Sequence, residues 1–337
     1  MPSSVSVVIP AYNATATLRV CVEALLHGSV PPLEILIVDD ASRDGTPDLA
    51  RALAAENPGV VRVLTQESNG GPAVARNRGA VAAQGEYLVF VDSDTRPLPD
   101  MIERFLARIP EADAVSGIYA MEPLNDGLVP RYKAYFNYYG FSREGVFAYE
   151  TFSASTAGIR ASVFREVGGF NESFAWGMDY ENEEIGRRIV RRHRLLLDPA
   201  MTSQHAFPDF AKLTRTYFHR VSIWAEFFLR TPKLESGGLA TARIGLGTLA
   251  APAAIGTALV AGIWPVLWPV PTALAAAFAW CMSGFYGFVA RNRPAFLPAA
   301  VLLNVYFSSV IAAGAAYGVL RVLTGTGRVR AGDRPAV

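Results

Sequence analysis

Short apolar runs alternate with helical patterns over the first 120 residues of the chain. The runs are rich in β-branched residues, and between them apolar positions recur three or four residues apart. The predicted strands are residues 5–9, 34–38, 60–64 and 87–91. Fully apolar strands separated by helices predict an α/β fold with a mostly parallel sheet, covered on both faces. Ligands of such sheets bind at the carboxyl ends of the strands, near the switch in strand order, so we expect the chemistry directly after each strand.

Residues 113–235 mix further strands with aromatic-rich stretches, and we interpret them as the other half of the same fold. The first domain is therefore expected to cover residues 1–235. Near its end, residues 215–230 carry aromatic side chains on most turns, with basic residues between them. This pattern indicates either an amphipathic helix near 213–232 at a membrane surface or an ordinary core helix.

The next part of the chain is almost free of charge. No charged residue occurs within 244–290 or within 294–320. Because a bilayer-spanning helix needs about 20 apolar residues, the first stretch predicts a hairpin, broken by the prolines and tryptophans of 264–271. The second stretch predicts a further segment. We expect a membrane domain over 244–322, with two to three transmembrane segments at about 245–265, 270–290 and 296–320, and then a polar tail over 323–337.

The orientation of these segments is predicted from the flanking charges. The chain lacks a basic leader and enters a strand directly, so we expect the first domain on the cytoplasmic side of a cell inner membrane that the protein crosses more than once. Arg291 and Arg293 agree with this under the positive-inside rule. Three full spans would place the basic tail outside, so either the third segment is re-entrant or the rule is weakly obeyed. The net charge of +1 gives no general attraction to nucleic acid.

Polar residues follow three of the predicted strands, at Pro10–Asn13, Asp39–Thr46 and Asp92–Thr95. A carboxylate at the end of an apolar strand is costly unless it meets a partner, which makes it a candidate ligand-binding group. If the third of these stretches is a turn, Asp92 and Asp94 can approach one hard cation, Mg²⁺ or Mn²⁺. Such a cation is commonly shared with substrate phosphates.

Arg76 lies in the stretch between the third and fourth predicted strands. The preceding glycines allow a tight turn, from which Arg76 could reach a phosphate; a surface arginine is the alternative.

Four stretches resemble the inverting glycosyltransferases of family 2, which have the GT-A nucleotide-sugar fold: VVIPAYN, ILIVDDASRDGT, GPAVARNRGAVAAQGEYLVFVDSDT and ASVFREVGGFNESF. The similarity covers about residues 4–205. It implies a nucleotide-diphosphate sugar donor, a divalent metal and inversion at the anomeric carbon. By this likeness the base and ribose would be held by Pro10, Ala11, Tyr12 and Asp40, and the metal and diphosphate by Asp92 and Asp94. The predicted nucleotide-sugar site also includes Asn13, Arg76 and Ser93.

The expected catalytic base is altered in this sequence. Family members usually place it in a Glu-Asp pair that opens a helix, and on YENEEIGRR this pair falls on Glu181 and Asn182. An asparagine cannot accept a proton at neutral pH. Glu181 stands four residues before Ile185, on the face that Ile185 and Ile189 mark as buried. Glu181 is therefore the first candidate for the base, and Asp179, which also fits the N-cap, is the second.

The remaining charges of this helix, from Glu183 to Arg192, predict a solvated face with ion pairs four residues apart.

A different acceptor would remove the need for a base. The oxygen of a lipid phosphate is already ionised, and the chain would then resemble polyprenyl-phosphate glycosyltransferases, which share this fold and carry membrane helices. His205 stands where many family members have a histidine near the diphosphate or acceptor. It is a candidate third metal ligand or phosphate donor, with a structural role as the alternative.

These patterns together predict a membrane-bound inverting glycosyltransferase. It would move a sugar from a nucleotide-diphosphate donor to a lipid-linked saccharide or polyprenyl-phosphate acceptor in the synthesis of a cell-envelope glycan. One alternative is a catalytically impaired membrane scaffold that keeps the nucleotide-sugar site, which only Asn182 suggests. The other is a processive polysaccharide synthase, which usually has a Gln-x-x-Arg-Trp stretch that this sequence lacks.

Overall fold

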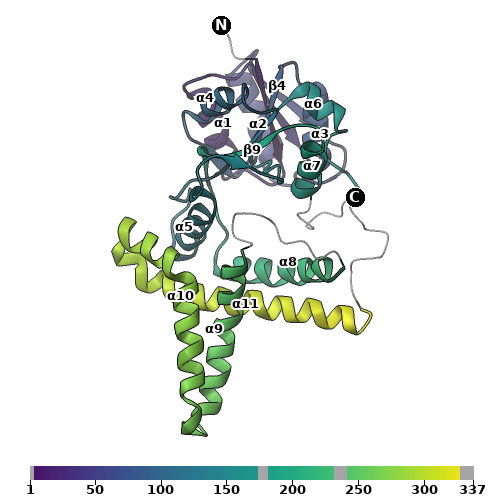
Figure 1. Cartoon of the computed structure of the whole chain (residues 1–337). Helices are drawn as coiled ribbons and strands as arrows, with labels where there is room; N and C mark the ends of the chain where they lie inside the picture. The colour runs from purple at the N-terminus through teal and green to yellow at the C-terminus, as the bar shows by residue number, and fades with distance from the viewer. Residues whose placement is uncertain (1–3, 174–180, 231–240, 327–337) are drawn as a thin grey trace. The chain divides into compact units, whose positions relative to one another are not determined.

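The computed structural model describes residues 4–173, 181–230 and 241–326. The chain forms two compact units (Figure 1). The sheet unit contains the described residues up to Asn125 together with Ser142–Ala206, and the helical unit contains Asp126–Phe141 together with the described residues from Phe207 onwards. Residues 126–141 and the helix after Phe207 are thus part of the same unit as the apolar helices, because their contacts are mainly within that unit. The domain boundaries drawn from the sequence stay predictions.

The sheet unit is built on one mixed sheet. Its described strands are β1 (Val5–Ala11), β2 (Glu34–Asp39), β3 (Val61–Thr65), β4 (Tyr87–Val91), β5 (Thr95–Pro97), β6 (Ala114–Tyr119), β7 (Phe147–Ala148), β8 (Thr156–Arg160) and β9 (Leu195–His205). Their order is β3-β2-β1-β4-β8-β6-β9-β5, and β7 pairs with β9. The first four strands run parallel, whereas β8 is antiparallel to both of its neighbours. The predicted mostly parallel α/β sheet is confirmed, and the four predicted strands correspond to β1–β4.

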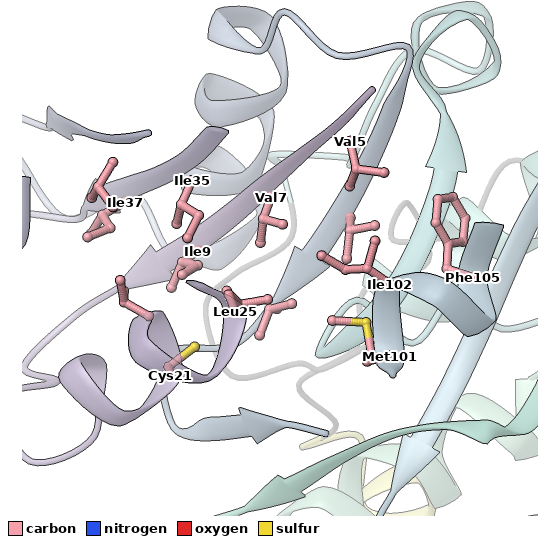
Figure 2. Close-up of a cluster of buried hydrophobic side chains, with 14 of the residues drawn as sticks. Val5, Val7, Ile9, Cys21, Leu25, Ile35, Ile37, Met101, Ile102 and Phe105 are labelled. Atoms are coloured by element: carbon pink, nitrogen blue, oxygen red, sulfur yellow. The ribbon is translucent and has the colours of Figure 1, made fainter. Parts of the chain in front are cut away.

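Helices cover both faces of this sheet. They are α1 (Leu18–Leu26), α2 (Thr46–Glu56), α3 (Pro72–Ala82), α4 (Met101–Arg108), α6 (Ala161–Glu166) and α7 (Glu181–Val190). Side chains of a strand alternate between faces, and in β1 Val7 points into one apolar core and Val8 into the other. Figure 2 shows the first core, where residues of β1 and β2 meet those of α1 and α4. The second core contains residues of α3, α6 and α7.

The strand order fixes where a ligand can bind. From β1 the chain moves outward through β2 and β3, and then returns to place β4 on the other side of β1. The switch in strand order therefore lies between β1 and β4, and the crevice outside their carboxyl ends is the expected binding position. Pro10–Asn13 and Asp92 lie at these two strand ends.

The helical unit consists of α5 (Leu128–Ser142), α8 (Phe210–Arg230), α9 (Ala242–Ala261), η1 (Pro265–Leu267), α10 (Pro269–Asn292), η2 (Pro294–Phe296) and α11 (Leu297–Leu323). Ser142, the last residue of α5, is counted with the sheet unit. Within the described residues, three apolar stretches are long enough to cross a membrane: Ala242–Ala261, Pro265–Asn292 and Pro294–Leu323. They indicate membrane association.

The pair α9–α10 forms a hairpin (Figure 1). Its tip carries the exposed Trp264 and Trp268, which suit a membrane interface. Residues 231–232 of the predicted amphipathic helix and residues 327–337 of the predicted tail lie outside the described residues.

Candidate active site

The turns after β1 and β2 are tied to each other. Asn13 adopts the left-handed conformation (φ 50°), and its Oδ1 accepts a hydrogen bond from the backbone N–H of Arg43 at 2.9 Å. In return, the N–H of Asn13 donates to the Ser42 hydroxyl at 3.0 Å. Asparagine tolerates this conformation better than most residues. The neighbouring Tyr12 is exposed at the strand end, while Ala11 is buried.

Asp40 is buried, and its carboxylate is bound by the loop that leads into α3. It accepts hydrogen bonds from the N–H groups of Gly70 and Gly71, each at 2.8 Å, and from Nε2 of Gln66 at 2.6 Å. A carboxylate that accepts several donors is well stabilised in a buried place. Asp40 therefore fixes the Gly70–Gly71 backbone beside the strand ends. Its predicted contact with a base or ribose stays a prediction.

Arg76 joins the end of β4 to the start of α7. Its Nη2 lies 2.7 Å from Oδ1 of Asp92, and its Nη1 lies 3.5 Å from Oε1 of Glu181. The guanidinium is 5 % exposed and lies 5.4 Å from the centre of the Phe170 ring. Burial by itself would lower the pKa of Arg76, but the carboxylates of Asp92 and Glu181 outweigh burial and raise it. The alternative of a surface arginine is thus wrong: Arg76 is an enclosed cation shared by two carboxylates.

Residues 92–95 form the turn that the metal prediction required. The backbone oxygen of Asp92 accepts hydrogen bonds from the N–H of Thr95 at 3.1 Å and from its hydroxyl at 2.8 Å. Ser93 is half-buried within this turn. The two carboxylates of the turn have different surroundings. Asp92 is bound by Arg76, whereas the side chain of Asp94 is 48 % exposed.

His205 lies beside Asp94 at the end of β9. Its Nε2 is 3.4 Å from Oδ2 of Asp94, and its ring lies 4.4 Å from that of Tyr119. The pairing of β5 with β9, in which Thr95 faces His205, brings these residues together. Within the described residues, no three His, Cys, Asp or Glu side chains gather as a ready-made metal cluster. An accessible carboxylate with an adjacent imidazole still suits a cation that takes its remaining oxygen ligands from a substrate diphosphate.

Glu181, the first candidate for the base, lies in the first turn of α7. Glu181 opens the helix, and its side chain is 14 % exposed, facing Arg76. Asn182 points elsewhere: its Oδ1 accepts from the N–H of Ala154 at 3.4 Å, and its backbone oxygen accepts from the N–H of Phe152 at 3.0 Å. Asp179, the second candidate for the base, lies outside the described residues.

The second half of α7 differs from the solvated face that the sequence predicted. Glu184 and Arg188 do pair four residues apart, with Oε2 and Nη2 at 2.6 Å, but Glu184 is buried. Arg188 also donates to the backbone oxygens of Val167 and Gly169. This pair therefore fastens α7 to the turn after α6. The prediction failed because charge spacing along a helix does not tell which loop will cover it.

Comparisons with known proteins identify the family of the sheet unit. Residues 6–168 match the profile described as glycosyl transferase family 2. This segment belongs to glycosyltransferase family 2. It contains both strand-end turns, Arg76, Asp92 and Asp94, whereas Glu181 and His205 lie beyond it.

Two bacterial relatives illustrate the similarity. The chain is 40% identical over 129 residues to the glycosyltransferase GlyG of Streptococcus pneumoniae, covering 38% of this chain and 42% of the relative. It is also 40% identical over 102 residues to the putative teichuronic acid biosynthesis glycosyltransferase TuaG of Bacillus subtilis, covering 30% and 40%. The aligned region thus spans about two fifths of the length of these relatives.

The fold is that of a solved archaeal enzyme. The mannosyltransferase PcManGT of Pyrobaculum calidifontis, solved with GDP-Man and Mn²⁺, superimposes with a TM-score of 0.53. The superposition covers 91% of this chain and 88% of that one, at 20% sequence identity. The predicted GT-A fold is confirmed.

Proposed function

We propose that this protein transfers a glycosyl residue from a nucleotide-diphosphate sugar to a lipid-linked saccharide or polyprenyl phosphate in the synthesis of a cell-envelope glycan. The observation that carries the proposal is the convergence of Arg76, Asp92 and Glu181 at the switch point of a family 2 domain. The chain also has apolar helices long enough to hold it at a membrane. A lipid-borne acceptor suits an enzyme anchored in this way.

The strand-end turns are the proposed site for the nucleotide. Pro10–Asn13 would border the base, and Asp40 would act by fixing the Gly70–Gly71 backbone beside it. The donor class is supported by the mannosyltransferase relative in fold, which binds GDP-Man, and by the TarS protein of S. aureus, solved with UDP-GlcNAc at a TM-score of 0.51. These two donors have different bases, so the fold does not select the nucleotide.

A divalent cation, Mg²⁺ or Mn²⁺, would be held by Asp94 and His205. When bound, it would stabilise the negative charge that collects on the nucleoside diphosphate as the glycosyl bond breaks. Asp92 is the weaker candidate ligand because Arg76 binds its carboxylate. Asp92 would instead keep Arg76 in place, so that the guanidinium holds the end of β4 and the start of α7 together beside the diphosphate.

Glu181 is the proposed base for a hydroxyl acceptor. Its carboxylate is partly enclosed at the start of α7, on the same guanidinium as Asp92. It would accept the acceptor's proton as the oxygen attacks from the face opposite the leaving group, which inverts the anomeric carbon. A phosphate acceptor would need no proton removal, so the role of Glu181 depends on the acceptor.

The test uses the full chain in detergent with Mn²⁺, membrane lipid extract and a panel of uridine, guanosine and thymidine diphosphate sugars. Wild type should transfer label from one donor class into the lipid fraction, and Asp94→Ala should lose this transfer. Asp48→Ala is the matched control, because that carboxylate is 84% exposed on α2. Donor binding without transfer under every condition would contradict the proposed function. Equal transfer by wild type and Asp94→Ala would contradict the metal role alone.

A further inference from the structure

Helices α8 and α11 lie side by side and run in the same direction (Figure 1). The rings of Phe210 and Tyr306 are 4.7 Å apart near the start of the contact. Three further contacts follow in the same order along both helices: Phe218 with Gly314, Ser222 with Gly318, and Glu226 with Arg321. The two helices are therefore in register over 210–226 and 306–321.

This contact is tight and specific. A Cβ atom at Gly314 would lie 2.6 Å from the backbone oxygen of Phe218, and one at Gly318 would collide with that of Ser222. Two glycines four residues apart allow helices to approach this closely. At the far end, Nη1 of Arg321 lies 2.9 Å from Oε1 of Glu226, and both side chains are almost fully buried. Because a buried charge is costly once separated from its partner, α8 and α11 should move as one body.

The exposed residues of α8 are partly basic and partly apolar. The basic ones are Lys212, Arg215, His219 and Arg220, and Phe210, Trp224 and Leu229 are exposed beside them. A lysine or arginine at the centre of a bilayer costs about 2.5–3.5 kcal/mol on insertion scales. A helix with three exposed lysine and arginine cations is expected at the level of the lipid phosphates, where each cation is attracted to anionic headgroups.

The exposed face of α11 is apolar and lies opposite α8. It is formed by Leu302, Ala313, Ala316, Leu320 and Leu323. The last four recur at spacings of three, four and three residues, so they form one stripe. The glycines that contact α8 lie on the other side of the helix. The pair thus carries exposed basic side chains on α8 and an exposed apolar stripe on α11.

We propose that α8 and α11 form a two-helix platform that lies in the plane of an anionic membrane surface, so that α11 does not cross the bilayer. Because the two helices move together, α8 lies at the same depth in the bilayer as α11. If α11 crossed the bilayer, the cations of α8 would enter its hydrocarbon core. Figure 1 shows α11 running crosswise to the α9–α10 hairpin, as this arrangement requires. Only the hairpin would span the membrane: the 20 residues of α9 give a length of about 30 Å, which matches the hydrocarbon core.

The test measures depth along α11 in the full chain, with Cys21 and Cys281 replaced by Ala and a single fluorescent cysteine introduced. The label is placed in turn at Leu302, Ala316 and Leu323 in lipid vesicles, and quenching by lipids brominated at different chain depths is compared. Equal shallow depth at the three positions is expected. A profile that passes from one interface through the bilayer centre to the other would overturn the proposal. Labels at Leu246, Ile255 and Val266 of the hairpin are the matched control, and their depth should change along its length.

The lipid partner is tested with a label at Trp224, which is exposed on α8. Quenching by neutral acrylamide is compared in vesicles of phosphatidylcholine alone and in vesicles that also contain phosphatidylglycerol. The anionic lipid should reduce quenching in wild type but not in the variant Lys212→Gln, Arg215→Gln, His219→Gln. Equal quenching of wild type in both lipids would contradict an anionic partner. Neither experiment requires glycosyl transfer. Failure of the platform proposal can therefore be distinguished from failure of the proposed activity.

Discussion

Arg76 and Asp92 meet at the switch point of the sheet, with Nη2 and Oδ1 2.7 Å apart. The other arm of the guanidinium lies 3.5 Å from Glu181. One buried cation thereby sets the distance between the end of β4 and the start of α7, although 105 residues of chain separate Arg76 from Glu181. The candidate base and the strand that leads to the candidate metal site are therefore held by the same side chain.

Replacing Glu181 with glutamine should separate proton removal from binding. With a hydroxyl acceptor, Glu181→Gln should lower kcat by about 10²–10⁴-fold, since glutamine cannot take the proton, while donor affinity changes little. Initial rates and donor binding by calorimetry measure the two effects. Asn182→Ala is the control, because Asn182 points to Ala154. An unchanged kcat with the natural acceptor would contradict a base role and favour a phosphate acceptor.

His205 should govern metal affinity. We expect His205→Ala to weaken Mn²⁺ binding by at least about tenfold, a typical loss when the environment of a metal ligand is altered. The Mn²⁺ signal in electron paramagnetic resonance, recorded with nucleoside diphosphate present, reports binding without turnover. His27→Ala provides the comparison, because His27 is exposed at the end of α1 and its Nδ1 lies 2.8 Å from the backbone oxygen of Glu23. Identical Mn²⁺ titrations for wild type and His205→Ala would exclude His205 as a ligand.

The Glu184–Arg188 pair should matter for stability. Arg188→Met leaves Glu184 buried without its partner and removes two bonds to the turn after α6, so the expected loss is about 3–5 kcal/mol in the free energy of unfolding. Thermal denaturation in detergent measures it. Arg192→Met should be nearly neutral, because its side chain is 80% exposed. If the two variants unfold at the same temperature, Arg188 does not fasten α7.

Lys133 of α5 should make stability depend on pH. Its Nζ lies 4.7 Å from the centre of the Tyr217 ring, and burial, with the charge of Arg220 adding to it, lowers the pKa of Lys133 from 10.5 to about 7. Between these two pKa values the unfolded chain holds a proton that the folded chain has released. Stability should therefore rise with pH in this window, by at most about 1.4 kcal/mol per pH unit.

The measurement is the difference in unfolding temperature between Lys133→Met and wild type as a function of pH. Lys133→Met should be the more stable protein near neutral pH, with its advantage shrinking as pH rises towards 10.5. Lys212→Met, at an exposed position, should show no such trend. If the difference in unfolding temperature between Lys133→Met and wild type did not change with pH, Lys133 would have the same pKa in the folded and unfolded chain.

The strands β1–β4 and the polar turns at their carboxyl ends could be predicted from the sequence because their signals are local. Each strand of β1–β4 is a continuous apolar run, and the polar turns follow directly, so the carboxyl edge of the sheet was located from the sequence alone. Arg76 could be singled out there, but its partners could not. Asp92 is 16 residues away and Glu181 is 105 residues away, and only packing brings α3 and α7 to the same strand end.

The sequence by itself determined an α/β sheet, a strand-end site rich in carboxylates and a long uncharged region, because periodicity and apolar length are properties of consecutive residues. The tertiary structure decided which of those charges are enclosed. It turned Asp40 towards the Gly70–Gly71 backbone, buried Glu184 with Arg188, and placed α8 along α11 through Gly314 and Gly318. The physical reason is the same in each case: a charge is stabilised by the donors that surround it, and distant segments supply those donors only after the chain has folded.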